Sequence, residues 1–144
     1  MATSNAATNY LERRLLHFLF KNNSLSFSSP GDSIYVGLCT AVSAAETGSV
    51  TEACFGGYAR QQVAAASWTT IGADSTDTQT AKNTSAIEFP AKTDSGNVTI
   101  THVIIADASS SGNILFVGAL DASKTLAQND IFRINATNLS IELK

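Results

Sequence analysis

The segment EACFGGYARQQV, residues 52–63, joins a pair of glycines to an alternating run of side chains. Gly56 and Gly57 can adopt a positive φ, which their neighbours Phe55 and Tyr58 would resist. We therefore predict a sharp turn at the glycines that leads into a strand over residues 58–64. Tyr58 and Arg60 would then share one face of that strand, because side chains alternate between the two faces.

The same period of two continues through most of the chain after residue 33. Hydrophobic alternation bounded by Gly, Pro, Asn, Asp or Ser predicts further strands at residues 34–39, 86–89, 98–106, 114–120, 131–134 and 139–143. Residues 40–50 and 66–85 are predicted to be loops. Seven or eight short strands with frequent turns indicate a mainly β protein, an antiparallel β-sandwich or jelly roll, with one helix in front.

That helix is predicted at residues 9–23, after a flexible arm of residues 1–8 and before a β domain of residues 24–144. Either Thr8 or Asn9 can cap its start. An apolar face at helical spacing is formed by Leu11, Leu15, Phe18 and Leu19 and widened by Leu16 and Phe20. A face this wide has to be buried, either on a sheet of the same chain or against copies of itself.

Composition and charge exclude several classes of function. The chain has 144 residues, a net charge of −3 and only 15% charged residues, and its basic residues form no stripe that would suit nucleic acid. No apolar run has the length of a membrane span, so we expect no membrane insertion. Cys39 lies in an apolar run and is expected to be a buried free thiol, with a disulfide to Cys54 as the alternative.

Residues that could perform chemistry are few and scattered. His17 and His102 lack the neighbouring ligands that a metal site needs, and no nucleophile or phosphate-binding motif is present. Asp107, Asp121 and Asp130 fall at predicted strand ends or turns, where Asp bonds the local backbone. We therefore expect no catalytic residue, no metal and no cofactor.

Two residues, Trp68 and Arg60, are candidates for contacts with a partner. Trp68, in the predicted loop at 66–85, is a candidate for an outward-facing carbohydrate-binding loop. Arg60 has two interpretations that the sequence leaves open. It is either a solvent-facing side chain on a sheet or, with Tyr58, an anchor at a subunit interface, where Tyr and Arg are enriched.

In their order along the chain, these segments resemble a family of small tailed-bacteriophage virion proteins known as tail fibre or minor tail proteins. The resemblance is carried by the segments NYLE (9–12), IYVGL (34–38), TE (51–52), GGYARQ (56–61), NT (83–84), FP (89–90), IIAD (104–107), GNILFV (112–117), GAL (118–120) and KT (124–125). It covers nearly the whole chain. One departure is Cys54-Phe55, where similar sequences have small residues before the glycines.

The resemblance implies a non-enzymatic structural protein of the virion, assembled in the cytoplasm of a bacterial host. We expect a homotrimeric tail fibre or minor tail component that contacts other virion proteins of the tail or the major capsid protein. The candidate subunit-interface residues are Leu11, Leu15, Phe18, Leu19, Tyr58 and Arg60. The alternatives are a capsid decoration protein that stabilises the head and a module that binds a host surface glycan through Trp68.

Overall fold

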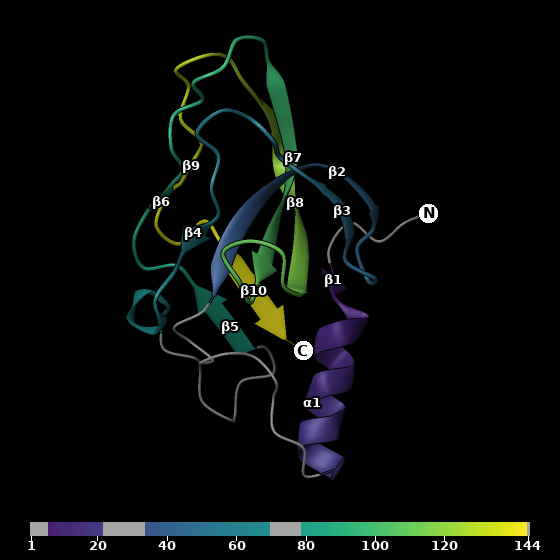
Figure 1. The fold of residues 1–144 in the computed structure, drawn as a ribbon. Helices are drawn as coiled ribbons and strands as arrows, with labels where there is room; N and C mark the ends of the chain where they lie inside the picture. The colour runs from purple at the N-terminus through teal and green to yellow at the C-terminus, as the bar shows by residue number, and fades with distance from the viewer. Residues whose placement is uncertain (1–5, 22–33, 70–78, 144) are drawn as a thin grey trace.

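One curled antiparallel sheet forms most of the structure, a computed structural model that describes residues 6–21, 34–69 and 79–143 (Figure 1). Its strands run in the order β1-β8-β7-β2-β3, and β4 also pairs with β2. The bounds are β1 Ala6–Ala7, β2 Tyr35–Ala44, β3 Ser49–Glu52, β4 Gln61–Gln62, β7 Val98–Ala106 and β8 Ile114–Leu126. The strong twist of the long strands β7 and β8 makes this sheet a half-barrel.

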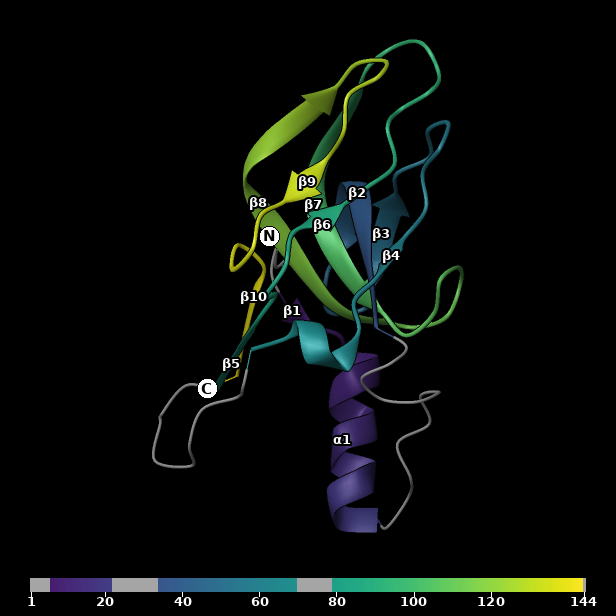
Figure 2. The same cartoon turned by 90° about the vertical axis from the view of Figure 1, so that its left-hand side faces the viewer.

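Two small antiparallel sheets face the half-barrel (Figure 2). One pairs β5 (Gln79–Lys82) with β10 (Ser140–Leu143), and the other pairs β6 (Ile87–Glu88) with β9 (Arg133–Ile134). They stand where a sandwich has its second layer. A short 3₁₀ helix, η1 (Ala65–Ser67), and one α-helix, α1 (Asn9–Lys21), complete the described elements. The predicted class, mainly β and antiparallel with one N-terminal helix, is confirmed.

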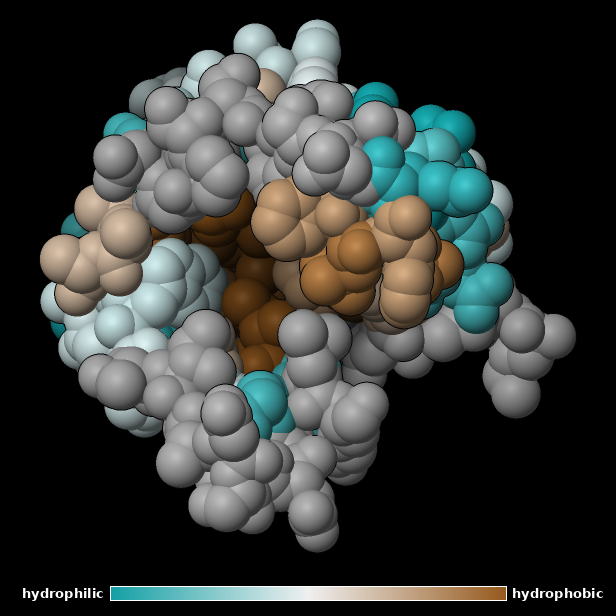
Figure 3. Space-filling view, turned by 90° about the horizontal axis from the view of Figure 1, so that it is seen from below, coloured by the Kyte–Doolittle hydropathy of each residue, from teal (hydrophilic) through white to brown (hydrophobic). Residues whose placement is uncertain are grey.

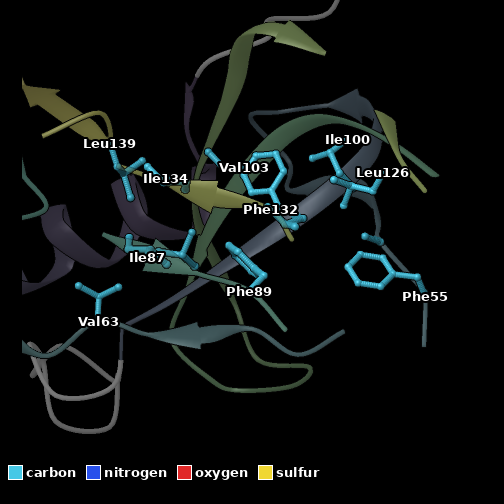
Figure 4. Packing of buried hydrophobic residues seen from close by; sticks show 13 residues of the cluster. Phe55, Val63, Ile87, Phe89, Ile100, Val103, Leu126, Phe132, Ile134 and Leu139 are labelled. Atoms are coloured by element: carbon cyan, nitrogen blue, oxygen red, sulfur yellow. The ribbon is translucent and has the colours of Figure 1, made fainter. Parts of the chain in front are cut away.

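The main core lies between the inner face of the half-barrel and the small sheets (Figure 4). Strands β2, β7 and β8 contribute Val36, Leu38, Ile100, Val103 and Leu126, and the small sheets and connecting segments contribute Phe55, Val63, Ile87, Phe89, Phe132, Ile134 and Leu139. The ring of Phe89 meets that of Phe132 edge to face at 5.9 Å. Each such buried side chain contributes roughly 1.5–3 kcal/mol, so this layer holds the half-barrel closed.

A second, smaller cluster covers the opposite face of the long strands. Cys39, Ile104 and Val117 alternate with core residues along β2, β7 and β8, and Ala45 packs with them. Both faces of the central strands are therefore buried. This explains why residues 103–106 are apolar in succession and all buried. β7 has the predicted bounds.

The predicted loop at residues 40–50 is wrong, because β2 continues to Ala44 and turns back into β3. The register of this hairpin shifts between Cys39 and Ala41 and again between Val42 and Ala44. Each shift is a β-bulge or a similar irregularity, which breaks the period of two in the sequence. Only Gly48, with φ +69°, is recognisable in advance as the turn.

Other predicted boundaries also change. The strand predicted at 58–64 pairs only at Gln61–Gln62, and the predicted loop at 66–85 contains η1 and β5. In contrast, β8 runs six residues beyond the predicted end at residue 120, to Leu126. Most of this extension is polar and exposed, so no hydrophobic alternation signals it.

Candidate subunit interface

The glycine pair makes the predicted turn and packs against the segment 91–94. Gly57 has φ +89°, and a Cβ there would lie 2.7 Å from the carbonyl oxygen of Ala91. A Cβ on Gly56 would collide with the hydroxyl of Thr93, whose backbone N–H donates to the Gly56 carbonyl at 2.9 Å. Gly57 is therefore required by its positive φ and by the close backbone of Ala91, while Gly56 makes room for the Thr93 side chain.

The turn brings Tyr58 and Arg60 to one carboxylate, that of Glu52 at the end of β3. Arg60 donates to it in bidentate fashion, from Nε to Oε1 and from Nη2 to Oε2, both at 2.8 Å. The Tyr58 hydroxyl donates to the same Oε1 at 2.7 Å and accepts from the backbone N–H of Leu38 at 3.0 Å. We call Glu52, Tyr58 and Arg60 the carboxylate clamp. It connects β3, the turn and the middle of β2.

Charge and burial in the carboxylate clamp reinforce each other. The Arg60 side chain is only 5% exposed, and its hydrogen bonds hold the pKa of Glu52 below its ordinary value. The bond to Glu52 raises the pKa of Arg60. Burial, together with the bond to Glu52, raises the pKa of Tyr58. The clamp therefore consists of an ion pair and a neutral phenol at physiological pH, and nothing in it is poised to transfer a proton.

Arg60 also holds the loop between β7 and β8. Its Nη1 donates to the carbonyl of Ala108 at 2.8 Å and to that of Ser111 at 2.9 Å. Asp107 supports the same loop by accepting from the backbone and side-chain N–H groups of Asn113. Tyr58 and Arg60 are thus bonded within their own subunit, and their predicted role at an interface between subunits stays a prediction.

The base of α1 is fixed to the half-barrel. Thr8 is buried and is the N-cap, since its hydroxyl accepts from the Leu11 N–H at 3.4 Å and donates to the Ile114 carbonyl at 2.6 Å. The backbone N–H of Thr8 donates to Leu115, and that of Asn9 donates to Glu46. The last three residues of the predicted arm, 6–8, therefore belong to the fold, and they set the direction of the helix.

Beyond this base, α1 runs away from the half-barrel (Figures 1 and 2), and none of its residues is fully buried. The covered side of the helix carries Tyr10, Arg14 and His17, and Leu11 is half-buried at its margin. The Arg14 guanidinium lies 5.4 Å from the centre of the Tyr10 ring. Exposed side chains are Leu15, Leu16, Phe18, Leu19 and Phe20, of which Leu19 is 61% and Phe20 76% exposed. The apolar face of α1 was predicted to pack either on a sheet of the same chain or against other copies. The first alternative is wrong, because these side chains are exposed.

An apolar groove opens beside the helix. It has a volume of about 800 Å³ and lies between β8 and β10, next to β1. Its walls include Val103, Phe116, Leu120, Ile134, Leu139 and Ile141, several of which are core residues with one side reaching the groove. Seen from below, brown apolar atoms line this hollow, and the apolar side chains of α1 lie next to its mouth (Figure 3). The groove and the helix thus form two neighbouring apolar surfaces.

Trp68 follows η1 and packs partly against the main core. Its backbone forms an isolated antiparallel bridge with Asn83, a buried residue whose side chain bonds Ser85, Asn135 and Leu139. The Trp68 ring is therefore half-buried. Carbohydrate stacking on Trp68 stays a prediction, and residues 70–78 of the same predicted loop lie outside the described residues.

The acidic residues near strand ends and turns either bond to nearby groups or lie far from one another. Asp130 accepts from the backbone N–H of Ala127, and Glu88 lies 3.6 Å from Arg133 across β6 and β9. Asp121 is on the rim of the groove. Within residues 6–21, 34–69 and 79–143, no three His, Cys, Asp or Glu side chains gather where they could hold a metal ion.

Both cysteines are free thiols, so the alternative of a disulfide between Cys39 and Cys54 is wrong. Cys39 is fully buried on β2, and its burial raises its pKa to about 12. Cys54 is exposed. Cys39 is therefore inert, as the sequence predicted for a thiol in an apolar run.

Comparison with known proteins gives one match that spans nearly the whole chain. The model of a family described as "Podophage GP4 fiber I protein gp80" matches residues 6–142. No curated protein matches the chain. Among the described helices, none is both long and apolar enough to cross a membrane.

Proposed function

The chain belongs to the podophage GP4 fiber I protein family, and from this premise we propose that its copies form a trimer through the exposed apolar face of α1. As a member of that family it is a structural, non-enzymatic component of a phage tail fibre and part of the virion. A fibre component associates with other virion proteins. The family description names a fibre, which agrees with the tail placement expected from the sequence; it gives no support to capsid decoration.

The observation that carries the proposal is the contrast within α1 between a fixed base and an uncovered apolar face. Five large apolar side chains are exposed on one short helix. Contiguous apolar surface of this kind on a soluble protein marks an interaction site. Covering these partly exposed side chains would contribute on the order of 5 kcal/mol per subunit, enough to offset a large part of the entropy lost on association.

The width of the face favours more than two subunits. At 100° per residue, the exposed residues from Phe18 through Leu15, Leu19 and Leu16 to Phe20 span about 200° of the helix circumference. The apolar seam of a two-stranded coiled coil is narrower than this. A face of this width is broader than one partner helix covers, so it favours a larger assembly than a pair of helices.

The oligomeric state of the purified chain tests the proposal. We expect a trimer by native mass spectrometry and by light scattering. The double substitution Leu16→Asp and Leu19→Asp should give a folded monomer, because it places two charges on the apolar face without removing any core contact. Ser110→Asp, in the exposed loop between β7 and β8, adds a charge away from α1 and should leave the trimer intact.

Two results would contradict the proposal. One is a wild-type chain that is monomeric at micromolar concentration. The other is a double variant that keeps the wild-type mass. Circular dichroism and thermal unfolding of each variant show whether the β domain remains folded.

A further inference from the structure

We infer that α1 of one subunit docks in the apolar groove of the next, so that every copy gives its helix to one neighbour and receives a helix from another. The inference rests on the proposed function, in which α1 is the assembly surface. It adds the partner surface, namely the groove between β8 and β10 of a second copy of this chain.

The helix of the same subunit does not fill the groove. Its first turn is held to β8 and to the β2–β3 turn by the bonds of Thr8 and Asn9. From there α1 runs away from the half-barrel (Figure 2). Its large apolar side chains remain exposed. A helix that enters the groove therefore has to come from another copy.

Groove and helix match in chemistry. Phe116, Leu120 and Ile141 are half-buried on the groove walls, which leaves part of each side chain available to a partner. The exposed side of α1 offers Leu and Phe side chains, which can pack on the apolar part of the groove walls, while the charged side chains that line the groove, Asp121, Lys124, Arg133 and Glu142, keep their contact with water. This is the helix-in-groove mode of recognition, in which residues on one face of an amphipathic helix serve as anchors.

The rim of the groove carries unpaired negative charge. Asp121 and Glu142 line it and take part in no ion pair within the described part of the chain. Of the two basic residues at the rim, Arg133 lies 3.6 Å from Glu88. Lys124 is then the remaining positive charge at the rim, against the two negative charges of Asp121 and Glu142.

The charge of α1 has the opposite sign. The helix carries three basic residues, Arg13, Arg14 and Lys21, and one acidic residue, Glu12, which leaves a net charge of +2. Arg13 and Lys21 are exposed and can lie along the acidic rim when the apolar face is in the groove. We expect these opposite charges to orient α1 in the groove and to raise the rate of association.

The exposed area of α1 sets the size of one contact. Side chains of this size bury about 150–250 Å² each when aromatic, so the exposed face of α1 offers on the order of 500 Å². The groove of the partner adds a smaller area, so one contact falls below the roughly 1,000 Å² of a typical specific interface, and several contacts must act together. A helix-to-groove contact is heterologous, and three such contacts close a ring.

Cross-linking between defined positions tests which surfaces meet. In a Cys54→Ser background, whose remaining thiol Cys39 is fully buried, one chain carries Leu16→Cys and a differently tagged chain carries Ser140→Cys on the groove wall. After co-expression and treatment with a short bis-maleimide, we expect a mixed dimer. The matched pair Leu16→Cys with Ser110→Cys should give none.

The outcomes separate this inference from the proposed function. If native trimers form and Leu16→Cys cross-links only to Leu16→Cys of another chain, then α1 packs on α1; the docking inference is overturned and the proposed function stands. If the Cys54→Ser chain is monomeric, both are overturned. A mixed dimer of Leu16→Cys with Ser140→Cys supports both.

Filling the groove gives a second, independent test. Gly118 lies in the groove wall, and a Cβ there would meet only the Val103 side chain at 3.8 Å, an ordinary contact. Gly118→Phe should therefore fold, occupy the groove and weaken association by about tenfold or more. Thr99→Phe, an exposed position of β7 outside the groove, is the control. An unchanged trimer affinity in a folded Gly118→Phe chain would overturn the inference.

Discussion

The carboxylate clamp and helix α1 are both conspicuous in the sequence, but they differ in how completely their interactions are satisfied within one subunit. Arg60 has bidentate bonds to Glu52 and two further bonds to backbone carbonyls, and it is almost fully buried. The base of α1 is fixed to the half-barrel by Thr8, but the large apolar side chains of the helix are exposed. Side chains whose interactions are all made within one subunit, as in the carboxylate clamp, stabilise that subunit. Apolar side chains that remain exposed, as on α1, are available for assembly.

The largest effect is expected from Arg60→Ala. The substitution leaves the Glu52 carboxylate without its ion-pair partner and removes the bonds to Ala108 and Ser111. We expect the free energy of unfolding to fall by about 3 kcal/mol, near the lower end for a broken buried pair because Glu52 is partly exposed. Urea unfolding in the monomeric Leu16→Asp, Leu19→Asp background measures the effect without assembly.

The solvent-facing interpretation of Arg60 is wrong, because its side chain is only 5% exposed. The same variant distinguishes the role of Arg60 within the subunit from its predicted role at a subunit interface. Arg60→Lys is the matched control, because it keeps the charge and loses the bidentate geometry, so it should recover part of the stability. If Arg60→Ala leaves the monomer as stable as before but abolishes the trimer, then Arg60 is an interface anchor, and the contrast between clamp and helix is broken.

Next in size is Gly57→Ala at the turn that builds the clamp. A Cβ at Gly57 meets both an unfavourable φ of +89° and the Ala91 carbonyl at 2.7 Å. The comparison position is Gly96, which has φ +81° and where an added Cβ would have no heavy atom within 4 Å. Gly96→Ala should cost about 1 kcal/mol from the backbone alone, and Gly57→Ala about 2–3 kcal/mol. Equal losses in thermal unfolding would show that the close approach to Ala91 is unimportant.

These two regions also show what sequence reasoning can and cannot supply. The start of the helix at Asn9 and the glycine turn were predictable, and the cap was narrowed to Thr8 or Asn9, because helical spacing, capping and positive φ are local properties. The predicted helix end at residue 23 lies outside the described residues. The role of Glu52 was not, since no local pattern marks which carboxylate an arginine will meet. The groove was not predictable either, because β8 and β10 belong to different sheets and no local pattern shows how those sheets pack.

A smaller effect is expected from pH. The pKa of Glu52 is lowered in the folded state by its bonds to Arg60, so the carboxylate binds protons less readily than in the unfolded chain. Its stabilising contribution is therefore complete above the ordinary Glu pKa of 4.5 and is lost as the pH falls through the lowered folded value. Chemical unfolding of the monomeric background from about pH 6 to about pH 3 should show this loss. Glu52→Gln should remove the part of the pH dependence that comes from the Glu52 carboxylate.

The smallest effect on subunit stability is expected from Phe20→Ala, although Phe20 is a large apolar residue. Its side chain is 76% exposed and belongs to neither hydrophobic core cluster, so the free energy of unfolding of the monomer should change by less than about 0.5 kcal/mol. The trimer should nevertheless dissociate at a higher concentration, because the covered area is lost only in the assembly. Phe132→Ala, which removes a buried ring of the main core, should do the reverse and destabilise the monomer by about 3 kcal/mol or more. If Phe20→Ala destabilises the monomer as much as Phe132→Ala, then α1 is part of the subunit core, and the assignment of its apolar face to assembly fails.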